Sequence, residues 1–304
     1  MKEIIQVDSI SQVHEFFNYP KPKHPLVSII KHSDDIHNFD FENVRFVFNL
    51  FHVSLKQFKK GSFNYGRNTY DFDEGTMVFT QPGQVMEFSD EKEASESAVP
   101  GWSLMFHPDL IRKSELGRTI HDYSFFDYES NEALHLSDAE KNSITELVMK
   151  IEEEYNQNID KHSQDLIISN IDLLLKYCKR FYDRQFYTRT NLNKDVLSRF
   201  EEVIRDYYKE GLPESLGTLS VSWCSNRLNL SSNYLGDLIK TETGKSAKEI
   251  LQDHLIDNAK NRLIGSTDSI SEIAYAMGYE QAQSFNRLFK SKTGMSPGEY
   301  RKLN

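Results

Sequence analysis

Two short stretches in the last hundred residues repeat one another and carry the clearest chemical signal in the sequence. Residues 240–246 read KTETGKS and residues 290–296 read KSKTGMS, at an offset of 50. Each stretch follows an amphipathic run and contains a glycine of the kind that ends a helix. We interpret the repeat as one binding unit used twice, and the chemistry expected of it is noncovalent recognition.

Each copy predicts two helices that meet at a tight turn. Upstream of the repeated stretch the offset becomes 49, which aligns Ser225 with Ala274 and Asn229 with Gly278. A small residue lets two helices cross closely, and Asn or Gly accepts the positive φ that the turn requires. The pattern predicts a helix-turn-helix in each copy. A helical repeat without DNA binding is the alternative.

The segment between the copies predicts a single helix from residue 246 to about residue 263. At about 1.5 Å per residue this helix spans roughly 27 Å. It could hold two recognition helices about 34 Å apart, in successive major grooves on one side of the DNA. One chain could then read DNA without dimerising.

Signatures of catalysis are absent from the sequence. It contains no Walker loop, no G-x-S-x-G, no Cys-x-x-Cys and no H-E-x-x-H. Five scattered histidines lack metal-ligand spacing, namely His24, His32, His37, His52 and His107. We therefore predict that the chain is not an enzyme and requires no metal or other cofactor.

Length and charge indicate that separate domains position the repeat. The 304 residues suggest two or three domains. Residues 193–304 carry 15 basic and 15 acidic side chains, so the net charge of −10 falls on residues 1–192. Neither a membrane-spanning run nor a signal peptide is expected. Cys178 and Cys224 read as reduced core thiols, and a cytoplasmic protein is expected.

Short β-type runs fill the first hundred residues after a mixed, extended lead-in over residues 1–24. Gly and Pro punctuate them, including Pro82-Gly83 and Pro100-Gly101, and their number suggests a small barrel or sandwich. The expected strands cover residues 26–30, 44–53, 55–58, 62–65, 76–80, 85–88 and 102–106.

Helical patterns then follow as far as a polar linker, which is expected over residues 188–194. A short helix is expected over 108–116, a second begins at the capping box of Ser137 and Glu140, and a third covers about 160–184. The apolar stripe of the third helix is a candidate dimer surface, with an intradomain core as the alternative. Its residues are Ile167, Ile171, Leu174, Cys178 and Phe181.

Residues from about 195 to the end resemble the AraC/XylS family of bacterial transcription regulators. The first copy contributes Leu230-Ser231 and Lys240–Gly244 to the resemblance. The second matches the family's terminal signature through Ser271–Ala274, Gly278-Tyr279, Phe285, Arg287, Phe289-Lys290, Gly294, Ser296-Pro297 and Tyr300-Arg301. The resemblance implies a C-terminal all-α domain with two helix-turn-helix motifs.

The family pattern also implies which side chains reach DNA. Arg287 suits guanine, and Gln283 and Asn286 suit adenine, whereas the lysines suit phosphates. Many relatives carry long polar or basic residues where this chain has Gly236 and Asp237. The full candidate set is Ser232, Asn233, Gly236, Asp237, Lys240, Gln281, Ala282, Gln283, Asn286, Arg287, Lys290 and Lys292.

For the first half, the resemblance implies a cupin-like sensory barrel over 1–134 and a helical, dimerising hairpin over 135–187. Residues 75–83 look like the family's glycine, strand and Pro-Gly turn, and Val85 and Met86 stand where a cupin enzyme would place a metal-binding His. The fold class expected is therefore multidomain α+β. Candidate ligand contacts are Arg45, Phe48, His52, Tyr65, Arg67 and Trp102.

The function expected is sequence-specific regulation of transcription, as an activator that works with RNA polymerase. A small-molecule effector or a partner at the N-terminal domain would change how the two domains dock or dimerise. The alternative is a protein-partner-binding module with constitutive DNA binding. A homodimer fits either reading.

Overall fold

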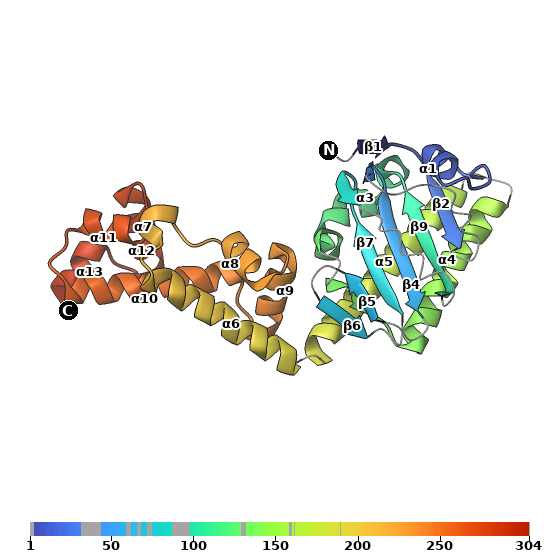
Figure 1. Cartoon of the computed structure of the whole chain (residues 1–304). Coiled ribbons are helices and arrows are strands. Elements are labelled where there is room, and N and C mark those ends of the chain that lie inside the picture. Colours follow the sequence, from blue (N-terminus) through green and yellow to red (C-terminus); the bar gives the residue numbers. More distant parts are fainter. Residues whose placement is uncertain are drawn as a thin grey trace. The chain divides into compact units, whose positions relative to one another are not determined.

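The computed structural model of the chain describes residues 3–31, 44–58, 62–65, 68–71, 75–86, 98–128, 132–157, 160, 162–188 and 190–303. These residues form two compact units, which meet in sequence between Gln185 and Phe186. The first unit contains the sheets and the second is helical (Figure 1). Among the helices described, none is long and apolar enough to cross a membrane.

The first unit is built on a five-stranded antiparallel sheet of order β10-β7-β4-β9-β2. Val53 of β4 lies between Phe79 of β7 and Leu104 of β9, and alternation along these strands makes the centre of this face apolar. A smaller sheet has the order β1-β3-β8, and β5 and β6 form a hairpin. The strands are β1 (Glu3–Val7), β2 (Val27–Lys31), β3 (Val44–Phe48), β4 (Phe51–Phe58), β5 (Ser62–Tyr65), β6 (Asn68–Asp71), β7 (Thr76–Thr80), β8 (Gln84–Met86), β9 (Ala98–Phe106) and β10 (Leu134–His135).

Two long helices, α4 (Asp138–Asn156) and α5 (Ser163–Thr188), cover the apolar face of the five-stranded sheet (Figure 1). The indole of Trp102 donates to Thr145 of α4 at 3.1 Å, and Cys178 of α5 lies 3.9 Å from the sulfur of Met77. Ser137 and Glu140 form the predicted capping box at the start of α4.

The apolar stripe of α5 therefore serves the core and not a dimer surface. Ile167, Ile171, Leu174 and Cys178 have no exposed surface, and Phe181 is 6% exposed. The prediction that these five residues form a dimer interface is wrong, because the apolar sheet face behind them must be covered by the same chain. Leu166 and Leu173, which are 46% and 43% exposed, remain on the surface of α5.

The first 24 residues, expected to be an extended lead-in, contain regular secondary structure. Residues 1–24 contain β1 and helix α1 (Ile10–Phe16), whose first turn is capped by Ser9. Ile10 and Val13 pack with Phe46 and Phe48 in a separate apolar cluster. The smaller sheet and the five-stranded sheet are distinct in the part of the chain described, so the two sheets and not a closed barrel are the observed architecture.

Pro100 and Gly101 lie inside β9, where a turn was expected. Leu55 pairs with Trp102 and Gln57 pairs with Val99, so β9 has one residue more than β4 between these pairs. Proline has no amide hydrogen to donate to a neighbouring strand. A bulge is one of the places in a sheet where this missing hydrogen bond is tolerated. Short helices follow β9: α2 (Pro108–Ile111), α3 (Glu115–Thr119), η2 (Ile120–Asp122) and η3 (Ser124–Asp127).

The second unit begins with a helix where the linker was expected. α5 runs to Thr188 and α6 starts at Thr190, so the described residues of the 188–194 segment are helical. Asn193 explains why a polar sequence is ordered here, because its amide donates to Phe186 O and, at 2.9 Å, to Glu242. The helices are α6 (Thr190–Lys209), α7 (Pro213–Leu216), α8 (Val221–Leu228), α9 (Ser232–Thr243), α10 (Ala247–Gly265), α11 (Ile270–Ala276), α12 (Ala282–Thr293) and α13 (Pro297–Leu303).

Both cysteines are free and buried, and this arrangement makes a chemical prediction. Burial raises the pKa of the Cys178 thiol and raises that of Cys224 to about 12. Because the thiolate is the reactive form, we expect neither to react at pH 8 with a chromogenic disulfide reagent until the protein unfolds. In denaturant, two thiols per chain should react at once. Rapid labelling of the native chain would contradict the buried positions.

Candidate functional site

The two copies of the repeat form two matching helix pairs, α8 with α9 and α11 with α12. Thr243 and Thr293 each donate a hydroxyl hydrogen bond one turn back along their own helix, at 2.7 and 2.8 Å. Gly244 and Gly294 then end α9 and α12 in the left-handed conformation. α10 connects the two pairs and contributes Leu255, Ile256, Ala259 and Leu263 to the core shared with α11 and α12. This geometry is the tandem helix-turn-helix that the repeat predicts.

The turn of each pair contains the predicted residue with positive φ, but the two turns differ in their surroundings. Asn229 has φ 56° and is exposed, whereas Gly278 has φ 88° and packs against another loop. A Cβ atom added to Gly278 would lie 2.3 Å from the carbonyl carbon of Gly217. Tyr207 of α6 holds that loop by donating to Gly217 O at 2.9 Å. The second turn thus requires glycine for two independent reasons.

The exposed face of α12 carries the side chains best suited to reading base edges. Gln283 and Arg287 are exposed one turn apart, and Gln281 and Lys290 are exposed beside them. Arg287 forms no hydrogen bond or ion pair within the described part of the chain. Its guanidinium is therefore available for two parallel hydrogen bonds to guanine.

Three other predicted positions of α12 are less available. Ala282 and Asn286 are half-buried, and the Oδ1 atom of Asn286 is enclosed. Lys292, expected at a phosphate, instead pairs with Asp253 of α10 at 2.9 Å. The N-cap residue Gln281 makes no side-chain capping hydrogen bond, so the first amides of α12 remain for water or a phosphate.

On α9, the exposed candidates are Ser232, Asn233 and Lys240, while Gly236 and Asp237 are half-buried. Ser232 Oγ lies 3.0 Å from Ser225 Oγ of α8, which fixes the crossing of the two helices at the small residue. The helix starts at an ordinary cap, where Ser231 accepts from the amide of Tyr234 at 3.1 Å. α9 offers shorter side chains to a groove than α12 does.

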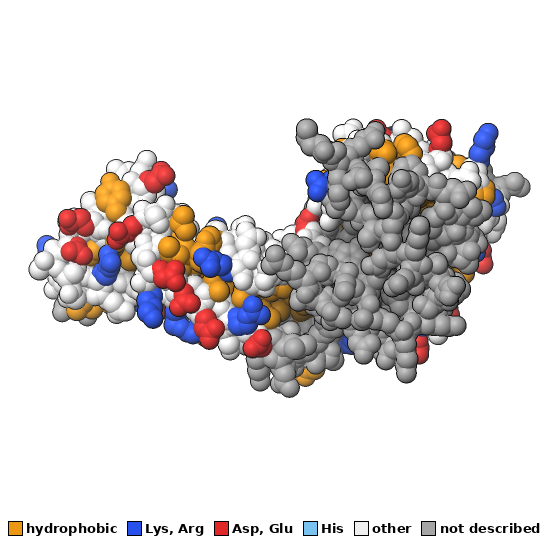
Figure 2. Space-filling model, viewed as in Figure 1, with side chains coloured by type: hydrophobic (Ala, Val, Ile, Leu, Met, Phe, Trp, Pro, Cys, Tyr) orange, Lys and Arg blue, Asp and Glu red, His pale blue; other side chains and the backbone are white. Residues whose placement is uncertain are grey.

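Charge on the second unit is mixed. Figure 2 shows lysine and arginine side chains interspersed with aspartate and glutamate over the visible face of this unit, without one continuous basic surface. Several cations are paired within the unit, including Lys245 with Asp253 and Lys260 with Asp257. Nonspecific attraction to phosphates should therefore be weak, and base contacts should contribute most of the selectivity.

Among the candidate ligand contacts that the structure describes, Trp102 and His52 lie on opposite faces of the five-stranded sheet. Phe48 and Trp102 are buried and Arg45 is exposed. The side chain of Tyr65 and the whole of Arg67 lie outside the described residues. His52 is buried on the face of the five-stranded sheet opposite α4 and α5, on the same side as Ser54 and Ser103.

Sequence reasoning missed these two serines. His52 Nε2 lies 3.0 Å from Ser103 Oγ, and Ser103 in turn donates to Ser54 at 3.1 Å. The signal for them was the alternation along β4 and β9, which puts polar residues between apolar ones. No group of three or more His, Cys, Asp or Glu side chains among the described residues could hold a metal ion.

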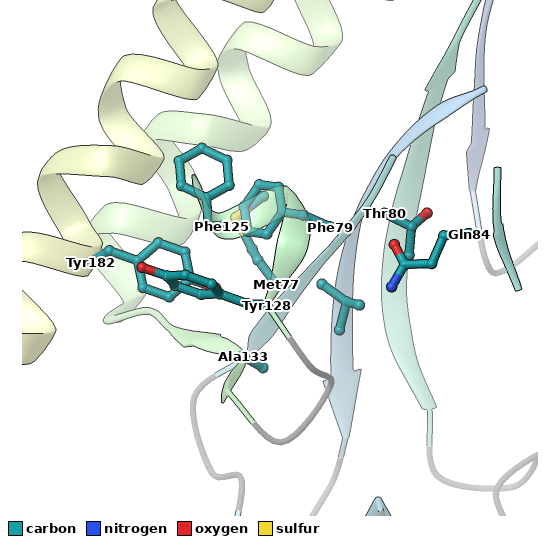
Figure 3. A pocket seen from close by; sticks show the side chains of 9 residues that line it. Met77, Phe79, Thr80, Gln84, Phe125, Tyr128, Ala133 and Tyr182 are labelled. Atoms are coloured by element: carbon teal, nitrogen blue, oxygen red, sulfur yellow. The ribbon is translucent and has the colours of Figure 1, made fainter. Parts of the chain in front are cut away.

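The cavity behind β7 is small and mostly aromatic. Figure 3 shows Phe79, Phe125, Tyr128 and Tyr182 around it, with Thr80 and Gln84 at its polar side. Its volume of about 20 Å³ is enough for about one water molecule. In this conformation the cavity is too small for an organic effector.

Comparison with known proteins finds a domain family and several relatives that are named as regulators. Residues 224–303 match the model of a family described as a helix-turn-helix domain. The raffinose operon transcriptional regulatory protein RafR of Pediococcus pentosaceus is 31% identical over 144 residues, which are 46% of this chain and 50% of that protein. The uncharacterized HTH-type regulator YijO of Escherichia coli is 26% identical over 64% of each chain.

A solved structure is also similar to part of this chain. The C-terminal domain of the two-component response regulator yesN from Fusobacterium nucleatum is 29% identical, with a TM-score of 0.30, and covers 33% of this chain and 96% of that domain. The chain spans about half to two thirds of the length of the two curated relatives named above.

Proposed function

We propose that the chain is a sequence-specific transcriptional activator and that its second unit, in which residues 224–303 match a helix-turn-helix family, is a DNA-binding domain of the AraC type. The observation that carries the proposal is the pair of exposed reading helices, α9 and α12, held on one scaffold helix. Arg287, exposed and unpaired among the described residues, supports base reading by α12. Promoter DNA and RNA polymerase are the proposed partners.

The test of this function is selection of bound DNA from a random pool with the full chain. We expect one motif with two separated elements, one for each reading helix. Duplication of the whole motif would add support for a dimer. A pool that shows no enrichment at low salt, with or without the effector probes described below, would contradict the proposal.

For regulation, we propose that a small ligand binds on the polar side of the five-stranded sheet. His52, Ser54 and Ser103 form a buried chain of hydrogen-bonding groups there, which suits a hydroxylated ligand. One relative is named for a raffinose operon, so raffinose and other neutral oligosaccharides are the probes. A shift in the thermal unfolding of the full chain that is lost in Ser103→Val would support the site.

The second candidate is a partner-binding module with constitutive DNA binding. The small size of the cavity behind β7 favours it, because that cavity is too small for an effector in this conformation. This alternative predicts no thermal shift with any oligosaccharide and the same DNA affinity in its presence and absence. A shift with changed DNA affinity would exclude it.

Dimerisation, if it uses α5, must use the face that the core leaves exposed. Leu166 and Leu173 lie two turns apart on that face. We expect the full chain to show twice its 35.4 kDa mass by light scattering and Leu173→Glu to show the monomer mass. Leu216→Glu, at an exposed leucine of α7, is the control and should leave the mass unchanged. A wild-type monomer at high concentration would contradict the dimer.

A further inference from the structure

A three-residue ion-pair bridge connects the ends of the two reading helices. Asp253 of α10 accepts from Lys245 at 2.8 Å with one carboxylate oxygen and from Lys292 at 2.9 Å with the other. Lys245 lies in the turn that follows α9, and Lys292 is the penultimate residue of α12. One side chain thus contacts both copies of the repeat.

The same position of the repeat is used twice to attach a reading helix to a scaffold helix. At the repeat offset of 50, Lys292 corresponds to Glu242, which accepts from Asn193 of α6 at 2.9 Å. The contact of Glu242 in the first copy is a hydrogen bond from an amide, whereas the contact of Lys292 in the second copy is an ion pair. Only the second also reaches, through Asp253, the turn that ends the other reading helix.

The two ion pairs of this bridge differ in exposure, because the side chain of Lys245 is 60% exposed and that of Lys292 is more enclosed. The side chains of Lys292 and Asp253 are 26% and 38% exposed. Hydrogen bonds from Lys245 and Lys292 lower the pKa of Asp253, although partial burial opposes the shift. Asp253 therefore remains ionised at neutral pH and satisfies two cations at once. Networks of this kind hold geometry better than isolated exposed pairs do.

We propose that Asp253 is a positioning residue that fixes the separation of α9 and α12, and with it the spacing between the two DNA elements that the chain accepts. The inference rests on the proposed function, because spacing has meaning only if both helices read DNA. The bridge also keeps Lys292 from contacting the phosphates. Removal of the bridge should allow the chain to bind DNA with other spacings between the two elements. It should also increase the dependence of binding on salt.

The experiment measures binding of the full chain to its selected DNA and to versions with one base pair inserted or removed between the two elements. For Asp253→Asn we expect the penalty for altered spacing to fall about threefold to fivefold, the range of a partly exposed ion-pair network. The slope of log affinity against log salt should become steeper by about 0.9 if the freed Lys292 then contacts a phosphate.

A matched control removes the same charge one turn along the same helix. Asp257 pairs with Lys260, also on α10, at 3.0 Å, so Asp257→Asn changes the charge of the unit without opening a bridge between the copies. Its spacing penalty should equal that of the wild type. Lys292→Gln, which breaks the bridge from the side of α12, should reproduce the relaxed spacing of Asp253→Asn.

The outcomes separate the two proposals. Relaxed spacing in Asp253→Asn and Lys292→Gln, but not in Asp257→Asn, supports the bridge. Unchanged spacing in all three variants, with normal binding of the selected DNA, overturns the bridge and leaves the proposed function intact. Equal relaxation in all three also overturns it, because the effect would then follow net charge. A wild-type chain that selects no DNA overturns both.

Discussion

Replacement of Gly278 by alanine is expected to lower the free energy of unfolding of the second unit by roughly 2–5 kcal/mol. A φ of 88° is unfavourable for any residue with a Cβ atom, which costs on the order of 1–2 kcal/mol. The new methyl group would also lie 2.3 and 2.4 Å from the carbonyl carbon and oxygen of Gly217. Backbone cannot rotate away as a side chain can, so overpacking adds about 1–3 kcal/mol.

Gly294→Ala isolates the first of these two costs. Gly294 has φ 83°, nearly the same backbone conformation, but nothing lies within 4 Å of the position of its Cβ. We expect this variant to lose only about 1–2 kcal/mol. Denaturant titration of the full chains, followed by the fluorescence of Trp223 in Trp102→Phe backgrounds, measures both. Equal losses in the two variants would show that the contact with Gly217 contributes nothing.

The difference between these two glycines marks what the sequence could predict. The repeat aligned Asn229 with Gly278 and assigned both to tight turns, because turn residues and helix caps depend on near neighbours in sequence. The close approach to Gly217 depends on a loop 61 residues earlier, held by Tyr207. Periodicity and capping rules contain no information about such a distant neighbour.

The corrections in the first unit have a related cause. The apolar stripe of α5 was read correctly as a buried surface, but periodicity does not say whether a sheet or a second subunit covers it. Here the apolar centre of the face of β4, β7 and β9 takes that stripe. Leu166 and Leu173 lie outside the stripe. Only the structure shows that they are exposed and could contact a second chain.

Composition alone also fails to predict the contacts of some polar residues. Residues 188–194 have the composition of a linker, yet α6 begins at Thr190 because Asn193 finds partners in Phe186 and Glu242. Lys292 is a residue type that suits a phosphate contact, yet its ammonium group pairs with Asp253. In both cases the conformation or contact depends on a partner side chain on another helix, Glu242 or Asp253. The residue types within the segment do not reveal such a partner.

Replacement of Arg287 by alanine is expected to weaken binding to the selected DNA by about 5- to 150-fold, since a bidentate contact to guanine is worth about 1–3 kcal/mol. The side chain is exposed on α12 and makes no hydrogen bond or ion pair within the described residues, so its loss should leave folding unchanged. The loss should be confined to one base position of one element. Repeating the DNA selection with the variant measures this directly.

Two controls separate reading of bases from attraction to phosphates. Lys290→Ala removes a charge from the same helix and should weaken binding to all sequences alike, with a salt slope about 0.9 shallower. Arg262→Ala removes an exposed arginine from the scaffold helix α10 and should change the preferred sequence at no position. If Arg287→Ala behaves like Lys290→Ala, Arg287 contacts the backbone, and sequence reading must come from Gln283 or from α9. Residues 193–304 carry no net charge that could supply strong nonspecific binding, so the selectivity of the chain depends on which of these holds.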